Sequence, residues 1–549
     1  MRSLHRRLGP RSVYAALALG FILATSFSTA SAAANQTVIG SVEGIDAVGV
    51  VFGWALDPDT PSAAVDLHVY VEGPAGAGGR LIGVIPASIP RSDIPYPGPH
   101  GFRYLVPRQY WDRQAHRLYV YAIDSAAPAA SNAQLSGSPQ VFRRASTTLS
   151  LDNGFVRIGV EPRCGGTLAE LSVNGANLIN NADCTGRQVQ MALYDGNQRY
   201  DACAACTGVW GWNPVQGGDK YNFGSPSLTV ESGPDFIRVI TRPYEWNPDD
   251  KGGGPGRPVL SDVLLEQQIS FVPNHPRAVR LHYKLTHLAD HTRANALQEF
   301  PAVYVNLGYD RFIYYGGEAP WTNGAVSSTT LSDPSQPVPQ HYAPERWSAL
   351  VNDRDIGLTV FVPGQYPYVA GVRVEGTSGP FGSGANFFRP HIPLTLGPGS
   401  TFEGDIYLIA GNYKEARRAI YALNASVPAR DILPPFGYVD APAPGQRVGR
   451  TILVSGWAFD DTEVAAVEVL VDGVLAGTAR YGEPRPDVAT VFPNAPASIG
   501  FSFSLDTTKY SNGPHRVTVR VTDGQTVAVL PDIDLTVENS KKPARRRAR

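Results

Sequence analysis

The stretch Gly53-Trp54-Ala55-Leu56-Asp57 near the front of the chain returns near its end as Gly456-Trp457-Ala458-Phe459-Asp460. Each copy is followed by an alternating apolar and polar run that ends in a turn, a Pro-Arg-x-Asp segment, a Gly-Phe pair and a second alternating run. These landmarks in one order indicate an internal repeat. Because a period of two turns one face of a strand inward, each copy is predicted to be a β-sandwich.

The two repeated segments, residues 37–143 and 434–538, resemble the bacterial Ig-like modules of secreted enzymes and surface proteins. The repeated tryptophan, Trp54 or Trp457, is either a sugar-stacking platform or a core residue. A core position is favoured because tryptophan buries a large apolar area. In the Pro-Arg-x-Asp segments, we expect an Arg–Asp pair that braces the loop.

The first 33 residues have the order of a signal peptide: a positive region, an apolar stretch and small residues at a cleavage site. This order predicts a secreted protein, with an uncleaved N-terminal anchor as the alternative. No later segment approaches the roughly 20 apolar residues of a membrane span, so no membrane partner is expected after cleavage. The net charge of −2 gives no reason to expect nucleic acid as a partner, and residues 539–549 are predicted to be a basic disordered tail.

The middle of the chain, residues 146–424, is predicted to be one large domain of many short strands. The chain has 56 Gly, 46 Pro, 25 Tyr and 21 Phe, and turn formers with aromatic runs favour strands over helices. Helical periodicity is convincing mainly over 413–421. A β-only domain of this size must stack sheets face to face. The predicted fold class is therefore all-β.

Two features of this middle domain carry a resemblance. The strand opening at Asn153-Gly154 and the turn Val173-Asn174-Gly175-Ala176-Asn177-Leu178-Ile179-Asn180 resemble the galactose mutarotase-like fold. That large β-sandwich occurs in sugar epimerases, polysaccharide lyases and accessory domains of glycoside hydrolases. The resemblance implies a carbohydrate-active central domain flanked by two Ig-like sandwiches.

All four cysteines, Cys164, Cys184, Cys203 and Cys206, lie in the middle domain. An exported chain meets oxidising conditions, so two disulfides are predicted, with Cys164–Cys184 and Cys203–Cys206 preferred among three pairings. A zinc site is the alternative, but the single CxxC lacks a second pair. No metal or other cofactor is predicted, although a structural or catalytic calcium ion stays open.

Two kinds of position mark the candidate catalytic carboxylates: Glu318 and Glu345 stand close to a tryptophan in a loop, and Glu299 interrupts an otherwise apolar run, where an inward carboxylate must be paired or functional. Hydrolysis of a glycosidic bond needs two carboxylates about 5–9 Å apart, and Glu299, Glu318 and Glu345 are the candidates. β-Elimination instead needs a Tyr or His base, and Tyr304 or His287 would serve. The substrate carboxylate would then be neutralised by a group such as Arg187 or Asn213. Spacing along the chain does not choose between the two chemistries.

Planar amides, charged groups and aromatic rings are the groups that bind sugars, and they gather in the same loops. The candidate substrate-binding residues are Asp183, Arg187, Gln190, Trp212, Asn213, Asp219, Trp321 and Trp347. We expect the loops that carry Trp212, Asn213, Asp219, Glu299, Glu318 and Glu345 to converge on one cleft.

The sequence thus predicts a secreted carbohydrate-active protein, a glycoside hydrolase or a polysaccharide lyase, whose partner is a polysaccharide or oligosaccharide. A non-catalytic carbohydrate-binding or cell-surface protein is the alternative, because no phosphate loop, HExxH or GxSxG motif fixes the catalytic residues. The two end modules are expected to be dispensable for chemistry, since neither carries an evident acid–base pair.

Overall fold

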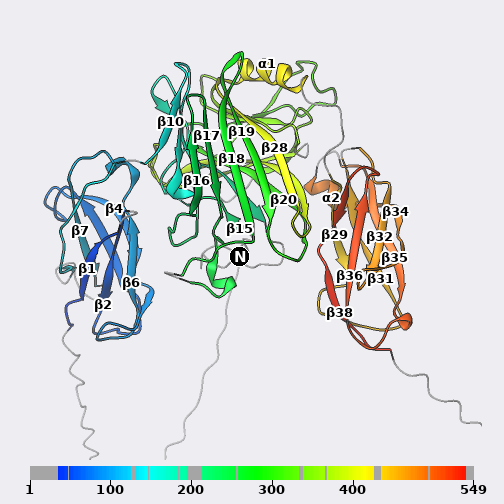
Figure 1. Cartoon of the computed structure of the whole chain (residues 1–549), viewed down its shortest axis with the longest axis horizontal. Coiled ribbons are helices and arrows are strands. Elements are labelled where there is room, and N and C mark those ends of the chain that lie inside the picture. The colour runs from blue at the N-terminus through cyan, green and yellow to red at the C-terminus, as the bar shows by residue number, and fades with distance from the viewer. Residues whose placement is uncertain are drawn as a thin grey trace, which may run out of the picture.

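The computed structural model describes residues 35–46, 49–124, 132–145, 147–183, 185–194, 212–254, 257–332, 338–364, 368–425, 434–460, 462–492 and 495–539. These residues are nearly all β, and their sheets stack into an N-terminal, a central and a C-terminal sandwich (Figure 1). The predicted signal peptide and the tail from residue 540 lie outside the described residues. In the part of the chain that is described, no helix is long and apolar enough to span a membrane.

The N-terminal and C-terminal sandwiches each contain a four-stranded sheet, and the two sheets match strand for strand. In the first, one sheet has the order β1 (Ile39–Ile45), β2 (Val50–Leu56), β6 (Gly98–Leu105) and β5 (Ile89–Arg91). In the second, the order is β29 (Phe436–Ala441), β31 (Thr451–Phe459), β35 (Ser498–Asp506) and β34 (Arg480–Pro484). Trp54 pairs with Gly101, as Trp457 pairs with Gly500, so the register of the repeat is the same.

The second sheet of each end sandwich completes its core. It comprises β3 (Asp66–Val71), β4 (Arg80–Pro86), β7 (His116–Ile123), β8 (Ala133–Gln134) and β9 (Gln140–Phe142) at the front. At the back it comprises β30 (Arg447–Val448), β32 (Ala466–Val471), β33 (Val474–Thr478), β36 (Gly513–Thr522), β37 (Val527–Val529) and β38 (Ile533–Val537). Alternate residues of these strands are buried, as the period of two predicts.

The Pro-Arg-x-Asp loops are braced by the expected ion pairs. Arg91 Nε lies 2.6 Å from Asp93, and Arg91 also binds Glu43 on β1. Arg485 binds Asp487 and Asp440 in the same way. The prediction of a bracing Arg–Asp pair is therefore confirmed in both copies.

The central sandwich packs a ten-stranded sheet against a nine-stranded sheet. The ten-stranded sheet contains β10 (Leu149–Asp152), β11 (Arg157–Glu161), β12 (Thr167–Val173), β13 (Ala176–Asn177), β14 (Val189–Tyr194), β15 (Trp212–Val215), β20 (Arg293–Asn306), β23 (Val338–Tyr342), β26 (Tyr368–Val374) and β27 (Ala385–Leu396). The nine-stranded sheet contains β16 (Ser227–Ser232), β17 (Phe236–Thr241), β18 (Val263–Val272), β19 (His275–His287), β21 (Arg311–Tyr314), β22 (Ser327–Thr330), β24 (Trp347–Val351), β25 (Ile356–Phe361) and β28 (Thr401–Asn412). One large apolar cluster, with members from Leu151 to Ala410, fills the space between them.

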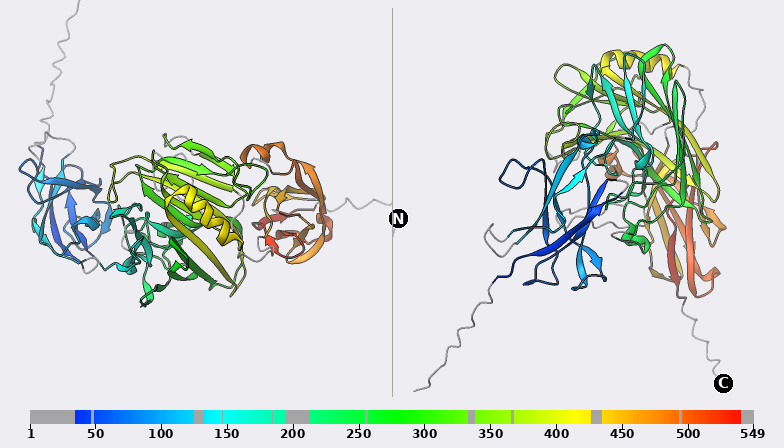
Figure 2. Two further views of the ribbon diagram at one scale, coloured as in Figure 1. Left: turned by 90° about the horizontal axis from the view of Figure 1, so that it is seen from above. Right: turned by 60° about the vertical axis from the view of Figure 1, so that its left-hand side comes forward.

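Helix α1 (Tyr413–Asn424) covers the outer face of the nine-stranded sheet (Figure 2). Its apolar side packs on Trp347 and Phe361. The predicted helical stretch is thereby confirmed. The outer face of the ten-stranded sheet carries no such helix in the described residues. It turns toward the C-terminal sandwich, where Tyr368 of β26 clusters with Trp457, Phe459 and Phe492. Phe492 comes just after the short helix α2 (Pro486–Val491).

The expectation that the repeated tryptophan is a core residue is confirmed for Trp457, which is buried in an apolar cluster. That cluster lies in the junction between two sandwiches, and Trp457 is absent from the core cluster of its own sandwich. Trp54 is half-buried. The two tryptophans share a register but not an environment.

Candidate functional site

A cleft of about 930 Å³ separates the ten-stranded sheet from the C-terminal sandwich. From the central sandwich its lining includes Tyr194, Gln340, Arg389 and His391. The facing wall includes Phe436, Tyr438, Trp457 and Asp532. One wall therefore offers hydrogen-bonding groups and the other mainly aromatic rings, of which Tyr438 is 55% exposed.

Strand β27 positions the polar floor of the cleft. Phe388 and Ile392 point into the core, so Arg389 and His391 point outward on the alternate positions. Across the pairing with β20, His391 lies opposite Glu299, and Arg389 Nη1 donates a hydrogen bond of 2.7 Å to Glu299 Oε1. Glu299, which the sequence singled out, is thus 5% exposed and ion-paired.

Burial controls the protonation of these groups. It raises the pKa of Glu299, an effect that Arg389 opposes. Burial, and then the charge of Arg389, holds the pKa of His391 well below its usual range. His391 is therefore a neutral imidazole at pH 7, and its Nδ1 has no hydrogen-bond partner among the described residues.

The same face continues toward Tyr304. The Tyr304 ring packs on Phe387 with centroids 4.6 Å apart, and the Arg187 guanidinium lies 5.2 Å from the centre of the Tyr304 ring. Burial raises the pKa of Tyr304 to about 12, although Arg187 acts in the opposite direction. The Arg389 guanidinium lies 5.7 Å from the centre of the Phe387 ring and also pairs with Glu299, so it connects the Tyr304–Phe387 pair to Glu299. We call this group the sheet-face strip: Arg187, Glu299, Tyr304, Phe387, Arg389 and His391.

Four predicted substrate-binding residues instead hold loops beside the strip. Asp183 Oδ1 accepts from the backbone of Thr185, Gly186 and Arg187, and Gln190 bonds to the backbone at positions 185, 187 and 217. Asn213 Oδ1 accepts from the Asn247 backbone, and Asp219 Oδ1 accepts from the backbone of Tyr221 and Phe223. A side chain already engaged by the backbone has few groups left for a ligand.

Glu345, Trp347 and Trp321 lie on the opposite side of the central sandwich, under α1. Glu345 is completely buried and pairs with Arg417, while Trp347 Nε1 donates to it at 2.7 Å. Glu318 is exposed in the neighbouring loop. Since Glu299 is on the outer face of the other sheet, the prediction of one shared cleft is wrong.

The remaining predicted residues have mixed outcomes. His287 is fully buried at the end of β19, beside Asp262. Trp212 begins β15, and its side chain lies outside the described residues. Cys164 is buried and disulfide-bonded, but Cys184, Cys203 and Cys206 lie outside the described residues, so the pairing stays a prediction.

Sequence reasoning missed Arg389 and His391. Both interrupt the apolar run Phe387-Phe388-Arg389-Pro390-His391-Ile392 at every second position, which is the signal that singled out Glu299. A polar residue that interrupts an apolar strand must be paired, solvated or functional.

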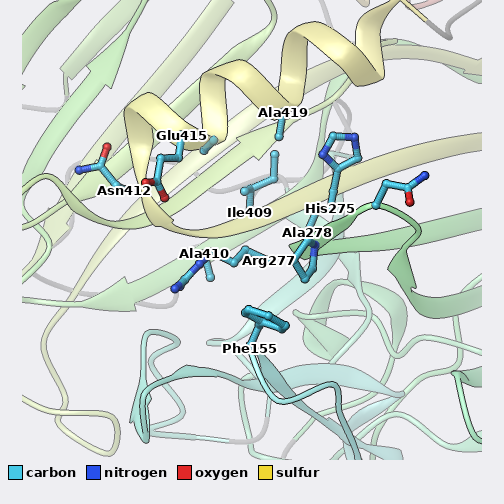
Figure 3. Close-up of a pocket in the computed structure, with 12 residues that line it drawn as sticks. Phe155, His275, Arg277, Ala278, Ile409, Ala410, Asn412, Glu415 and Ala419 are labelled. Atoms are coloured by element: carbon cyan, nitrogen blue, oxygen red, sulfur yellow. The ribbon is translucent and has the colours of Figure 1, made fainter.

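A smaller pocket of about 190 Å³ lies between α1 and the strands beneath it (Figure 3). Phe155, Arg277 and Glu415 are among its lining residues. It belongs to the α1 side of the sandwich and adds nothing to the sheet-face strip.

Comparison with known proteins supports the Ig-like prediction for the C-terminal sandwich. The bacterial Ig domain family matches residues 435–519. The search of curated proteins finds no match.

Three solved structures show weak likenesses. The first is a polysaccharide lyase (12% identity over 72% of this chain and 48% of the lyase, TM-score 0.26). The second is a putative aldose 1-epimerase from Klebsiella pneumoniae (14% identity over 58% of this chain and 90% of the epimerase, TM-score 0.29). The third is an endo-β-1,4-mannanase from Thermotoga petrophila (18% identity over 23% of this chain and 24% of the mannanase, TM-score 0.16). The chain thus spans about half of the lyase and a quarter of the mannanase, and none of these likenesses carries an argument about this chain.

Proposed function

We propose that this chain is a secreted carbohydrate-active protein that binds an acidic polysaccharide in the cleft and cleaves it by β-elimination. The observation that carries the proposal is the pairing of walls. Arg389 and His391 form a cationic and hydrogen-bonding floor, and Tyr438 and Trp457 face them with aromatic rings. Ligand sites typically combine such apolar faces with a few fixed polar groups.

The sheet-face strip is long enough for more than one sugar. Strand residues rise by about 3.3–3.4 Å each, so positions 387 and 391 on β27 are about 13 Å apart. Arg187 at one end and Arg389 near the other are each suited to a carboxylate, because a guanidinium binds carboxylate oxygens in pairs. A polymer of uronic acids repeats that charge along its length.

In the proposed cleavage, a base takes the proton from the ring carbon that bears the sugar carboxylate. The electron pair of that C–H bond forms the double bond of the product, and the bond to the glycosidic oxygen breaks. The leaving oxygen takes up a proton from water or an acid. We assign the base to His391, since it is neutral at pH 7, and charge neutralisation to Arg389, with Glu299 as its positioning residue.

Hydrolysis is less well supported by the described residues. A hydrolase needs two carboxylates that face one scissile bond. Glu299 on the strip is held by Arg389, and the carboxylates that line the described part of the cleft are Asp262, held by Arg293, and Asp532 on the opposite wall.

The test is product analysis with the full-length protein. Pectate, alginate and hyaluronan are incubated beside neutral mannan, and unsaturated ends are followed by ultraviolet absorbance. We expect unsaturated product from an acidic polymer, lost in His391→Ala and kept in Arg157→Met, an exposed arginine on the same sheet. Saturated reducing ends would indicate a hydrolase, and retention of an uncut polymer in affinity gels would indicate a binding protein; either contradicts the assigned chemistry.

A further inference from the structure

Three side chains with metal-binding atoms meet at one end of the cleft. Asp262 comes directly before β18, His287 ends β19, and His291 lies in the turn that follows. The pairing of Val263 with His287 brings the two strand ends together. One ligand atom from each of the three residues lies within 4.8 Å of the others.

The hydrogen bonds of His287 determine which of its nitrogens is free to bind an ion. Its Nδ1 lies 3.0 Å from the Gly397 carbonyl oxygen, which can only accept, so Nδ1 carries the hydrogen. In the neutral ring, the Nε2 lone pair then faces Asp262 Oδ2 at 3.2 Å. Two electron-rich atoms at that distance need a positive charge between them, either a proton or a metal ion.

The surroundings of His287 match those of a metal ligand. A histidine that binds a metal almost always donates its other N–H to a carbonyl or carboxylate, as His287 does to Gly397. The second histidine approaches the same carboxylate oxygen, with His291 Nε2 3.4 Å from Asp262 Oδ2. The His287 and His291 rings are nearly perpendicular, with centroids 5.1 Å apart.

Arg293 holds the carboxylate from the other side. Its Nη2 lies 2.7 Å from Asp262 Oδ1, and its Nε lies 3.0 Å from Oδ1 and 3.2 Å from Oδ2. The guanidinium weakens the attraction of the carboxylate for a cation, but it also fixes Oδ2 toward the histidines. His291 is 61% exposed, and Asp262 and His291 both line the cleft, so a bound ion would keep a coordination position open to it.

We propose that Asp262, His287 and His291 bind one zinc ion, with its fourth position open to the cleft. Two imidazoles and a carboxylate are ligands that zinc takes, and three protein ligands with one open position are typical of its catalytic sites. This replaces the expectation of a metal-free protein. The site stands on its own geometry and does not depend on cleavage of any glycan.

The experiment uses the full-length protein without a histidine tag, stripped with a chelator and titrated with zinc alone. We expect one zinc per chain by calorimetry and by elemental analysis after desalting. We also expect visible absorption bands of a tetrahedral site when cobalt replaces zinc. Zinc should raise the urea midpoint of unfolding, because a ligand that binds the folded state stabilises it.

His291→Ala is the decisive variant because the exposed side chain can be removed without disturbing the core. We expect it to lose at least about tenfold in zinc affinity, since even an outer-shell change typically costs that much. Asp262→Asn is a second variant. His275→Ala, next to α1 and far from the cluster, is the control and should bind as the wild type does.

Two outcomes would overturn the proposal. If zinc does not bind stoichiometrically and leaves the urea midpoint unchanged, a proton holds the cluster together. If His291→Ala binds zinc as tightly as the wild type, the metal is held elsewhere. Failure of glycan cleavage would leave the zinc measurement intact, so the two proposals fail separately.

Discussion

Replacing Glu345 with glutamine is expected to destabilise the central sandwich strongly. The side chain is 0% exposed and accepts five hydrogen bonds. Arg417 donates from Nε at 2.9 Å and from Nη2 at 2.8 Å, and Trp347 Nε1 and Tyr421 OH each donate at 2.7 Å. The Trp321 backbone donates the fifth at 3.0 Å. This one carboxylate therefore joins α1 to β24 and to the loop beside them.

The magnitude follows from what the substitution leaves behind. Glutamine removes the negative charge but leaves the Arg417 guanidinium, whose side chain is only 7% exposed. An uncompensated buried charge of this kind typically costs about 3–5 kcal/mol. That is a large part of the roughly 5–15 kcal/mol by which folded proteins are stable. Replacing both partners, in Glu345→Gln with Arg417→Met, is expected to recover part of the loss.

Urea unfolding followed by fluorescence measures the change, with Glu318→Gln as the control. Glu318 is exposed and should change the free energy of unfolding by no more than about 0.5 kcal/mol. If Glu345→Gln also stays within that range, the carboxylate does not hold α1, and its assignment as a structural residue is refuted.

The pH dependence gives an independent check. Burial alone would raise the pKa of Glu345, but hydrogen bonds from Arg417, Trp347 and Tyr421 outweigh it and lower the pKa. A carboxyl whose pKa is lower in the folded state stabilises the protein at pH values above its unfolded-state pKa of about 4.3. That stabilisation is lost as the pH falls through the folded-state pKa. Acid should therefore destabilise the wild type more steeply than Glu345→Gln.

Three other variants test the remaining assignments. Burial raises the pKa of Asp219 to about 7, so the contribution of this carboxyl to the free energy of unfolding falls as the pH rises from about 4 to 7. Asp219→Asn should therefore stabilise the protein by up to about 4 kcal/mol at pH 8 and not at pH 4, as measured by urea midpoints. Arg389→Met should abolish retention in acidic-polysaccharide gels, because it removes the cation of the cleft floor; unchanged retention would place binding elsewhere. Trp457→Ala should cost about 3–5 kcal/mol in the junction cluster and widen the particle in X-ray scattering, whereas an unchanged profile would argue against the aromatic junction.

The repeat was the part of the fold that the sequence predicted best. Trp54 and Trp457 occupy the same register, and the bracing pairs of Arg91 and Arg485 form as expected. These features depend on local pairing and on side-chain alternation, which a sequence displays directly. The junction around Trp457 was not predictable, because burial against another sandwich and burial in a core leave the same pattern.

The candidate site was predicted only in part, for a related reason. The apolar run around Glu299 marks its carboxylate as unusual, but it shows neither which face of the sheet the side chain is on nor which of two sheets the strand joins. Glu299 and Glu345 therefore looked equivalent, although one lies on the cleft face and the other under α1. The C-terminal sandwich supplies one wall of the cleft. This wall argues against the expectation that both end modules are dispensable for chemistry, which stays a prediction.

A crystal structure of the full-length protein with a bound oligouronate would show whether the cleft is the binding site. We expect a sugar carboxylate within hydrogen-bonding distance of Arg389, a ring carbon facing His391, and a sugar ring against Tyr438 or Trp457. A saccharide bound under α1, or on the N-terminal sandwich with the cleft empty, would contradict this expectation.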